Sequence, residues 1–232
     1  MIELASLHGV RLWQVDLDSY ATQFPLVGLS VEEHERAQSF AFERDGWRFL
    51  ASRHALRRVL GVVMGGLPRE IRIQADEVGK PCCPDMDAVQ FNLSHSAQYG
   101  LIGVSLNGLA VGVDVEVIRL IPEVNALVRS HFAPEERMQW AGISEHGRDS
   151  AFLSVWVRKE ACLKALGVGL AAEPASINVS ESSWSPKVNV PLGDRRCEVE
   201  VYPLNVLGEA TAAIALAEQS SVALAREYFQ AP

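Results

Sequence analysis

Apolar residues recur at three- and four-residue spacing in several stretches of the chain, which is the pattern of helices that bury one face. We expect helices at 30–42, 45–60, 122–141 and 150–166. Ser30 is a candidate N-cap with Glu33 at the capping-box position three residues later. Gly61 or the following Gly65-Gly66 pair would end the second helix, and Gly167 would end the last.

Other stretches alternate apolar and polar residues or are short apolar runs, which is typical of strands. We expect strands at 71–73, 90–93, 99–105, 110–116, 177–179, 198–202 and 210–216. Between the third and fourth of these lies Asn107-Gly108, a dipeptide typical of two-residue hairpin turns. The sequence therefore predicts a β-hairpin that joins 101–105 to 110–116.

A weak internal repeat runs through this pattern. Leu60-Gly61 precedes the expected strand at 71–73, and Leu166-Gly167 precedes that at 177–179, with one shared offset of 106 residues. The same offset places Ala55 on Ala161. Chance similarity is the alternative on this observation alone, but a repeat of this length favours two similar halves. We therefore expect an α+β (α/β) fold, a pseudo-dimer of two similar α+β halves, divided into 1–108 and 109–232.

Composition narrows the class of protein. The chain has 232 residues, 48% of them hydrophobic, and a formal net charge of −8, which disfavours a protein that coats the phosphate backbone of nucleic acid. We expect no membrane span, no secretory signal and a cytoplasmic location. The spacing of the four cysteines suits neither a zinc site nor a disulfide framework, so we expect free thiols.

Three short motifs could carry chemistry. Asp114 and Glu116 are two apart on an expected strand, so both carboxylates face one side and could bind Mg²⁺; a solvated strand face is the alternative. Glu160 and Lys164 are four apart on an expected helix and could add a third carboxylate and a cation for phosphate, or form an ordinary surface pair.

The third motif is Asn92-Leu93-Ser94-His95-Ser96. Ser94 and His95 point to opposite faces of a strand, so they do not form a nucleophilic pair, but hydroxyl and imidazole groups at a strand end can bind phosphate. A structural role in a turn is the alternative. Basic residues that could bind phosphate, or lie along a solvated helix face, are Arg36, Arg48, Arg53, Arg57, Arg58, Arg72 and Lys80. Neither a P-loop nor a Rossmann glycine motif is present.

In their order along the chain these pieces resemble a known family. Gly79-Lys80-Pro81, Phe91–Ser96, Gly112–Glu116 and the Trp156-x-x-Lys159-Glu160-Ala161-x-x-Lys164 helix are similar to the motifs of the 4′-phosphopantetheinyl transferase superfamily. The length and two-lobed plan resemble its surfactin-synthetase-activating (Sfp-like) branch. The resemblance implies the fold of that family, with the nucleotide bound by the N-terminal half and the metal by the C-terminal half.

The resemblance also implies a function. The family transfers the 4′-phosphopantetheine group of coenzyme A to a serine of an apo carrier protein, needs Mg²⁺ and releases 3′,5′-ADP. By position, the metal ligands would be Asp114, Glu116 and Glu160, and the catalytic residues Glu160 and Lys164. The residues that bind coenzyme A would be Arg36, Arg48, Arg53, Lys80, Ser94, His95, Asp114 and Lys164. Glu136 resembles a position that supports a metal-bound water.

The expected partner is an acyl or peptidyl carrier protein, and because the chain already holds two similar halves we expect a monomer. A coenzyme A-binding module without transfer activity and a Mg²⁺-dependent phosphohydrolase are the alternative functions.

Overall fold

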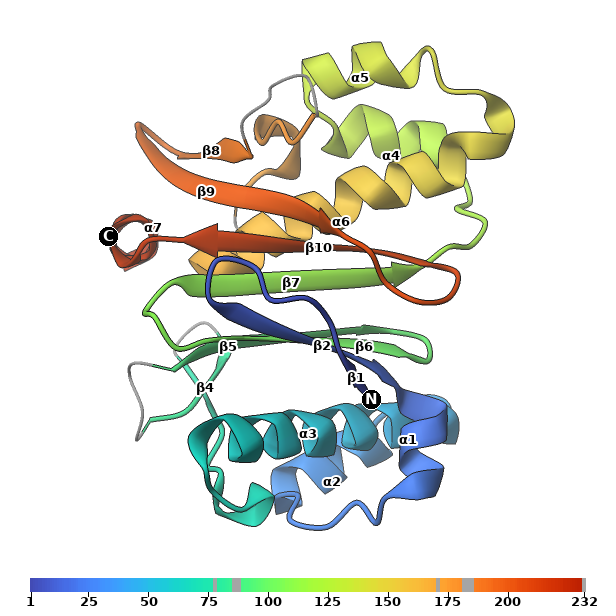
Figure 1. The fold of residues 1–232 in the computed structure, drawn as a ribbon. Coiled ribbons are helices and arrows are strands. Elements are labelled where there is room, and N and C mark those ends of the chain that lie inside the picture. The colour runs from blue at the N-terminus through green and yellow to red at the C-terminus, as the bar shows by residue number, and fades with distance from the viewer. Residues whose placement is uncertain (77–78, 85–88, 170–171, 181–185, 231–232) are drawn as a thin grey trace.

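The N-terminal half forms one antiparallel sheet covered by helices on its outer face (Figure 1). The computed structural model describes residues 1–76, 79–84, 89–169, 172–180 and 186–230. The sheet has the order β1-β2-β6-β5. The elements are β1 (Ile2–Glu3), β2 (Val10–Asp16), α1 (Leu17–Gln23), α2 (Val31–Gln38), α3 (Glu43–Met64), β5 (Gln90–Ser96) and β6 (Tyr99–Ser105). A small ladder of β3 (Gln74–Ala75) and β4 (Pro81–Cys82) lies between α3 and β5.

The C-terminal half forms a second antiparallel sheet with the order β7-β10-β9-β8. Its elements are β7 (Ala110–Val117), α4 (Val124–His131), α5 (Pro134–Trp140), α6 (Arg148–Leu166), β8 (Lys187–Leu192), β9 (Arg195–Leu204), β10 (Ala210–Ala217) and α7 (Gln219–Gln230). Among the described residues, none of the helices combines the length and apolar character that a bilayer span requires.

The two halves repeat one topology, which confirms the expected pseudo-dimer of α+β halves. Apart from β1, β3, β4, β8 and α7, each half consists of a strand, helices that include one long helix, and a hairpin whose second strand pairs with the first strand. Thus β2, α3, β5 and β6 correspond to β7, α6, β9 and β10. The offset of 106 residues recurs in the 3₁₀ turns Pro68–Glu70 and Pro174–Ser176, which each precede a buried isoleucine.

Four layers stack in the order helix, sheet, sheet, helix (Figure 1). One apolar cluster joins α3 to the first sheet, with Leu56 and Ile102 among its fully buried members. A second joins the two sheets through Leu12, Leu101 and Val113. A third joins α6 to the second sheet. Strand β7 therefore faces the first sheet on one side and α6 on the other.

Local signals explain where several helices begin and end. The predicted capping box is present, because Ser30 accepts from the Glu33 amide and the Glu33 carboxylate accepts from the Ser30 amide. Helix α6 ends at Leu166, and Gly167 is its C-cap, as expected, with φ of 72°. Helix α3 ends at Gly65 with φ of 71°, so Gly61 lies inside the helix, where its missing side chain admits the Gly66 carbonyl.

The strands expected at 71–73 and 177–179 and the hairpin at Asn107-Gly108 are wrong, and the helical region at 122–141 is divided in two. The segments 71–73 and 177–179 are irregular, because each follows a 3₁₀ turn that the proline at its start favours. The helical region expected at 122–141 is helical but holds two helices, with Phe132 and Ala133 extended before Pro134. Asn107-Gly108 reverses the chain, but β6 and β7 enter different sheets and stack face to face, so they form no hydrogen-bonded hairpin.

Candidate active site

Asp114 is the centre of the candidate site. It lies on β7 and is 4% exposed, and its Oδ1 accepts from the Ser94 hydroxyl at 2.7 Å and from Lys164 Nζ at 2.6 Å. Within the described part of the chain its Oδ2 is buried and has no hydrogen-bond partner. Burial raises the pKa of this carboxyl, and the Lys164 charge opposes that effect. A buried carboxylate oxygen without a partner is costly and suits a cation or another ligand.

Glu116 faces the same side of β7 two residues later. Its Oε2 accepts from the Ser96 hydroxyl at 2.6 Å and from Arg119 Nη1 at 2.8 Å. The alternation predicted for Asp114 and Glu116 therefore matches Ser94 and Ser96 of β5, which face them from the other half. Ser96 was not among the predicted site residues, although its i, i+2 spacing from Ser94 was a usable signal.

Glu160 and Lys164 bring α6 into the same cluster. Burial raises the pKa of Glu160, and so do the charges of Asp114 and Glu116, while Lys164 lowers it. The three predicted metal carboxylates are thus close enough to act on one another electrostatically. Helix α6 can come this near because a side chain on Gly112 of β7 would overlap its backbone.

The donor set fits a hard divalent cation, although the side chains are not gathered around one. Carboxylate oxygens are the ligands that Mg²⁺ prefers, and Asp114 Oδ2 is available. In the described residues no three His, Cys, Asp or Glu side chains are grouped tightly enough to hold a metal ion. In this conformation the Lys164 ammonium neutralises Asp114 instead. The residues therefore suit Mg²⁺ by chemistry.

His95 borders the cluster on the side of the N-terminal half. Its side chain is exposed, and its pKa is lowered by neighbouring atoms that restrict hydration and then by the charges of Lys164 and Arg53. Glu116 and Asp45 act on it in the opposite sense. His95 therefore lies between residues of both halves.

The predicted arginines differ in how they relate to this cluster. Arg53 acts on His95, and its Nε donates to Glu33 at 3.0 Å. Arg48 makes two hydrogen bonds to Asp18, at 2.6 and 2.7 Å, and lies 3.8 Å from Asp45. Arg36 is exposed on α2, with its guanidinium 5.5 Å from the Phe40 ring centre. The charge of Arg53 thus lowers the pKa of His95, while Arg48 lies beside Asp45, whose charge raises it.

Lys80 contacts the backbone of the two elements that carry Asp114 and Lys164. Its Nζ donates to the carbonyl oxygens of Lys164 at 2.8 Å and Val111 at 3.3 Å. Burial lowers its pKa to about 8, with a smaller opposing effect of Asp76. The residue also lines a cavity of about 390 Å³ between the two halves, together with Ala110, Gly167 and Arg226.

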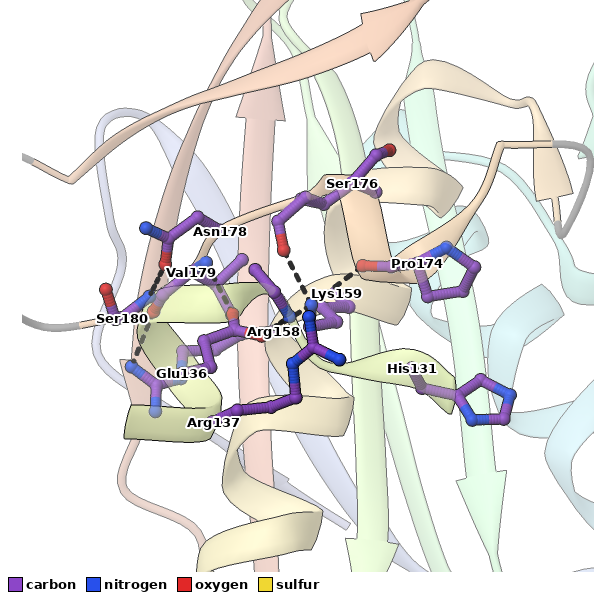
Figure 2. Close-up of polar contacts among 12 residues, drawn as sticks. His131, Glu136, Arg137, Arg158, Lys159, Pro174, Ser176, Asn178, Val179 and Ser180 are labelled. Atoms are coloured by element: carbon purple, nitrogen blue, oxygen red, sulfur yellow. Dashed lines mark hydrogen bonds and ion pairs between the residues drawn. The ribbon is translucent and has the colours of Figure 1, made fainter. Parts of the chain in front are cut away.

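Glu136 belongs to a different cluster (Figure 2). Its Oε2 lies 2.7 Å from Lys159 Nζ and accepts from the Ala133 amide at 2.8 Å, and its Oε1 accepts from the Val179 amide at 2.8 Å. Both oxygens are buried and engaged, so in this conformation Glu136 joins α5 to α6 instead of extending toward a water at the metal ligands.

Glu136 has a counterpart in the first half. Glu33 and Glu136 are each the third residue of a short helix, cap its first turn, and pair with a cation on the long helix of their half. Glu33 pairs with Arg53 at 3.0 Å and with the more buried Arg57 at 2.7 Å. Of these two, Arg53 lies 106 residues before Lys159. The repeat therefore extends to buried ion pairs that fix each short helix to its long helix.

Comparisons with known proteins agree with the sequence resemblance. A family model described as the 4′-phosphopantetheinyl transferase superfamily matches residues 110–217, and one described as 4′-phosphopantetheinyl transferase, N-terminal, matches 12–106. The 4′-phosphopantetheinyl transferase HetI of Nostoc sp. is 31% identical over 208 residues, 83% of this chain and 86% of its own.

Two further relatives carry similar names. A putative 4′-phosphopantetheinyl transferase of Synechocystis sp. is 36% identical over 145 residues, 62% of this chain, and the match spans only 58% of that protein. The 4′-phosphopantetheinyl transferase Sfp of Bacillus subtilis is 24% identical over 178 residues, 76% of this chain and 78% of its own.

Proposed function

The chain belongs to the 4′-phosphopantetheinyl transferase superfamily, and from this premise we propose that it transfers the 4′-phosphopantetheine group of coenzyme A to a serine of an apo acyl or peptidyl carrier protein, releasing 3′,5′-ADP. One observation supports the assignment above the others. Asp114, Glu160 and Lys164, from two elements of one half, meet Ser94 and His95 of the other half at a single cluster.

Asp114, Glu116 and Glu160 would hold Mg²⁺ in this proposal. When bound, Mg²⁺ neutralises negative charge between the carboxylates and the coenzyme A pyrophosphate and stabilises the leaving nucleotide. Asp114 supplies the strongest support, because its Oδ2 is buried without a partner among the described residues. The Ser94 hydroxyl on Oδ1 keeps that carboxylate oriented with Oδ2 directed away from it.

The carrier serine must lose a proton as its oxygen attacks the phosphorus atom next to pantetheine. We assign the proton to Glu160, directly or through a water, because burial and two neighbouring carboxylates raise its affinity for a proton. The bond from phosphorus to the bridging oxygen breaks, and 3′,5′-ADP leaves with that electron pair. Lys164, oriented by Asp114 and Ser94, stabilises negative charge on the transferred group.

The N-terminal half would hold the nucleotide part of coenzyme A. Ser94 and His95 end a strand at the cluster, and Arg53 acts on His95 from α3. We propose these residues, with Arg48 and Arg36 on the same half, for the phosphates of the nucleotide. Guanidinium groups suit this task because they donate two parallel hydrogen bonds to a phosphate.

The division into 1–108 and 109–232 also stays a proposal, as do a monomer and a cytoplasmic location. The two sheets support the division, since one uses strands that end at Ser105 and the other begins at Ala110. The repeated topology supports a monomer, because the contact between two similar halves, which a homodimer would form between two chains, is formed here within one chain.

The experiment incubates the protein with coenzyme A, Mg²⁺ and apo carrier proteins, and measures carrier modification over time. We expect activity in the wild type, loss on adding EDTA, and a large decrease in Glu160→Gln. Glu198→Gln, a change in an exposed pair, serves as the matched control. Full turnover of Glu160→Gln with intact Mg²⁺ dependence would exclude Glu160 as the base, and release of phosphopantetheine without a carrier would favour a phosphohydrolase.

A further inference from the structure

Lys80 connects the two halves of the molecule at one atom. It comes from the Gly79-Lys80-Pro81 segment of the N-terminal half, yet its Nζ donates to Lys164 and Val111, both in the C-terminal half. Val111 lies on β7 three residues before Asp114, and Lys164 lies on α6 four residues after Glu160. A single ammonium thus joins the strand and the helix that carry the candidate site.

The Lys164 carbonyl lies in the last turn of α6, where carbonyl groups need hydrogen-bond donors from outside the helix. Helix α6 ends at Leu166, so the Lys164 carbonyl is among the last four, which have no amide partner within the helix. A cation at this end is also favoured by the helix dipole. Lys80 provides both the hydrogen bond and the charge, and its aliphatic carbons pack at 3.9 Å from the place a Gly167 side chain would occupy.

The contact lies beside the closest approach of α6 to β7. Next to Val111 is Gly112, where a side chain would overlap the Ala161 carbonyl and the Ala165 amide. Helix α6 and strand β7 therefore touch at Gly112. Beside this contact the Lys80 ammonium joins them, because it donates to the Val111 carbonyl of β7 and to the Lys164 carbonyl of α6. Moving the end of α6 away from β7 would move Lys164 away from Asp114, 2.6 Å apart in this structure.

The surroundings of the ammonium do not resemble a phosphate site. Two of its three N–H groups donate to backbone carbonyls, and burial is the largest influence on its pKa. Among the described residues the charged groups that act on it are Asp76 and Arg226. A phosphate contact would require the ammonium to give up hydrogen bonds that hold α6 to β7.

We propose that Lys80 is a positioning residue of the transfer reaction, whose ammonium fastens the last turn of α6 to β7 and so sets Glu160 and Lys164 against Asp114. This role rests on the proposed function and replaces direct contact with coenzyme A, which the resemblance implies for Lys80. A residue of this kind affects the rate of the bound complex more than the affinity for coenzyme A.

The test compares Lys80→Met and Lys80→Gln with wild type, with Lys187→Met as an exposed-lysine control. We expect kcat to fall by about tenfold or more in both Lys80 variants, while the Kd for coenzyme A changes by less than about threefold. Lys80→Arg should recover part of kcat, since it retains a charged donor. An increase in Kd of about tenfold with unchanged kcat at saturation would show instead that Lys80 binds coenzyme A, and would overturn the proposal.

Hydrogen exchange gives a readout that does not depend on activity. In Lys80→Gln we expect faster exchange at the amides of 163–168 and 111–113, and unchanged exchange in α3. Unchanged exchange at the end of α6 would overturn the positioning role even if kcat fell. If the wild type modifies no carrier protein, the transfer function fails by itself, and the exchange result still decides whether Lys80 fastens α6 to β7.

Discussion

Replacing Glu136 with Gln removes the negative partner of a fully buried ion pair (Figure 2). The Lys159 and Glu136 side chains are each 1% exposed, and Nζ lies 2.7 Å from Oε2. Lys159 also donates to the carbonyls of Pro174 at 2.7 Å and Ile177 at 2.6 Å. The variant would leave this ammonium buried with carbonyl partners but without a counter-charge.

The magnitude follows from this geometry. Breaking a buried ion pair by removing one partner typically costs about 3–5 kcal/mol. Two carbonyls remain on Lys159, which places the expected loss for Glu136→Gln at about 3 kcal/mol. In addition, the Ala133 and Val179 amides both donate to this carboxylate, and a Gln side chain has only one oxygen to accept from them.

Lys159→Met should cost a similar amount, because it leaves the Glu136 carboxylate buried. The double variant should lose less than the two single losses together, by about 2 kcal/mol or more, because neither buried charge is then left alone. The loss in Glu136→Gln should also shrink at alkaline pH. Burial already lowers the pKa of Lys159 and Glu136 opposes this, so without Glu136 the folded state releases the proton at a lower pH and gains stability up to the unfolded pKa.

The assay is urea unfolding followed by far-ultraviolet circular dichroism for the wild type, the two single variants and the double variant at pH 7 and pH 10. Lys187→Met breaks a pair with the same 2.7 Å separation on the surface and should leave the unfolding midpoint unchanged. Additive losses in the double variant, or a single variant as stable as the wild type, would refute this account of the pair.

Three further predictions concern the candidate site. Gly112→Ala should destabilise the protein by about 2 kcal/mol or more and abolish transfer, because the new methyl group overlaps the α6 backbone. Gly66→Ala is the control and should unfold near the wild-type midpoint, because its methyl group would only touch the Ile71 side chain at an ordinary contact distance of 3.9 Å. Urea titrations and transfer assays measure both variants. Asp114→Asn should abolish carrier modification, and retained activity would contradict the metal site. Its unfolding midpoint at pH 7 should not fall, because burial of the Asp114 carboxylate already disfavours its charge in the folded state. The free energy of unfolding of the wild type relative to Lys80→Met should rise between pH 8 and pH 10, by up to about 3 kcal/mol, because the Lys80 pKa falls from 10.5 to about 8 on folding. Urea titrations measure it, and equal pH profiles of the two proteins would contradict the burial of the Lys80 charge.

Local signals in the sequence predicted much of the fold. The capping box at Ser30 and Glu33 and the glycine at the end of α6 depend on a few neighbouring residues, so they could be read directly. The i, i+2 spacing of Asp114 and Glu116 placed both on one face, and the structure pairs them with Ser94 and Ser96. The long helices of both halves were also found from their periodicity.

Features that depend on distant contacts could not be predicted this way. The Asn107-Gly108 signal is correct for a turn, but sheet membership depends on β10, about a hundred residues later, which pairs with β7 in place of β6. The strands expected after Pro68 and Pro174 do not form, because each proline starts a 3₁₀ turn. The resemblance named Lys80 but gave no sign that its ammonium is directed at two carbonyls of the other half.

The most direct measurement is tandem mass spectrometry of an apo carrier protein after incubation with this protein, coenzyme A and Mg²⁺. We expect one phosphopantetheine group on one carrier serine, dependent on Mg²⁺ and absent with Asp114→Ala. A folded protein that binds coenzyme A yet leaves the serine of every acyl and peptidyl carrier tested unmodified would contradict the proposed transfer.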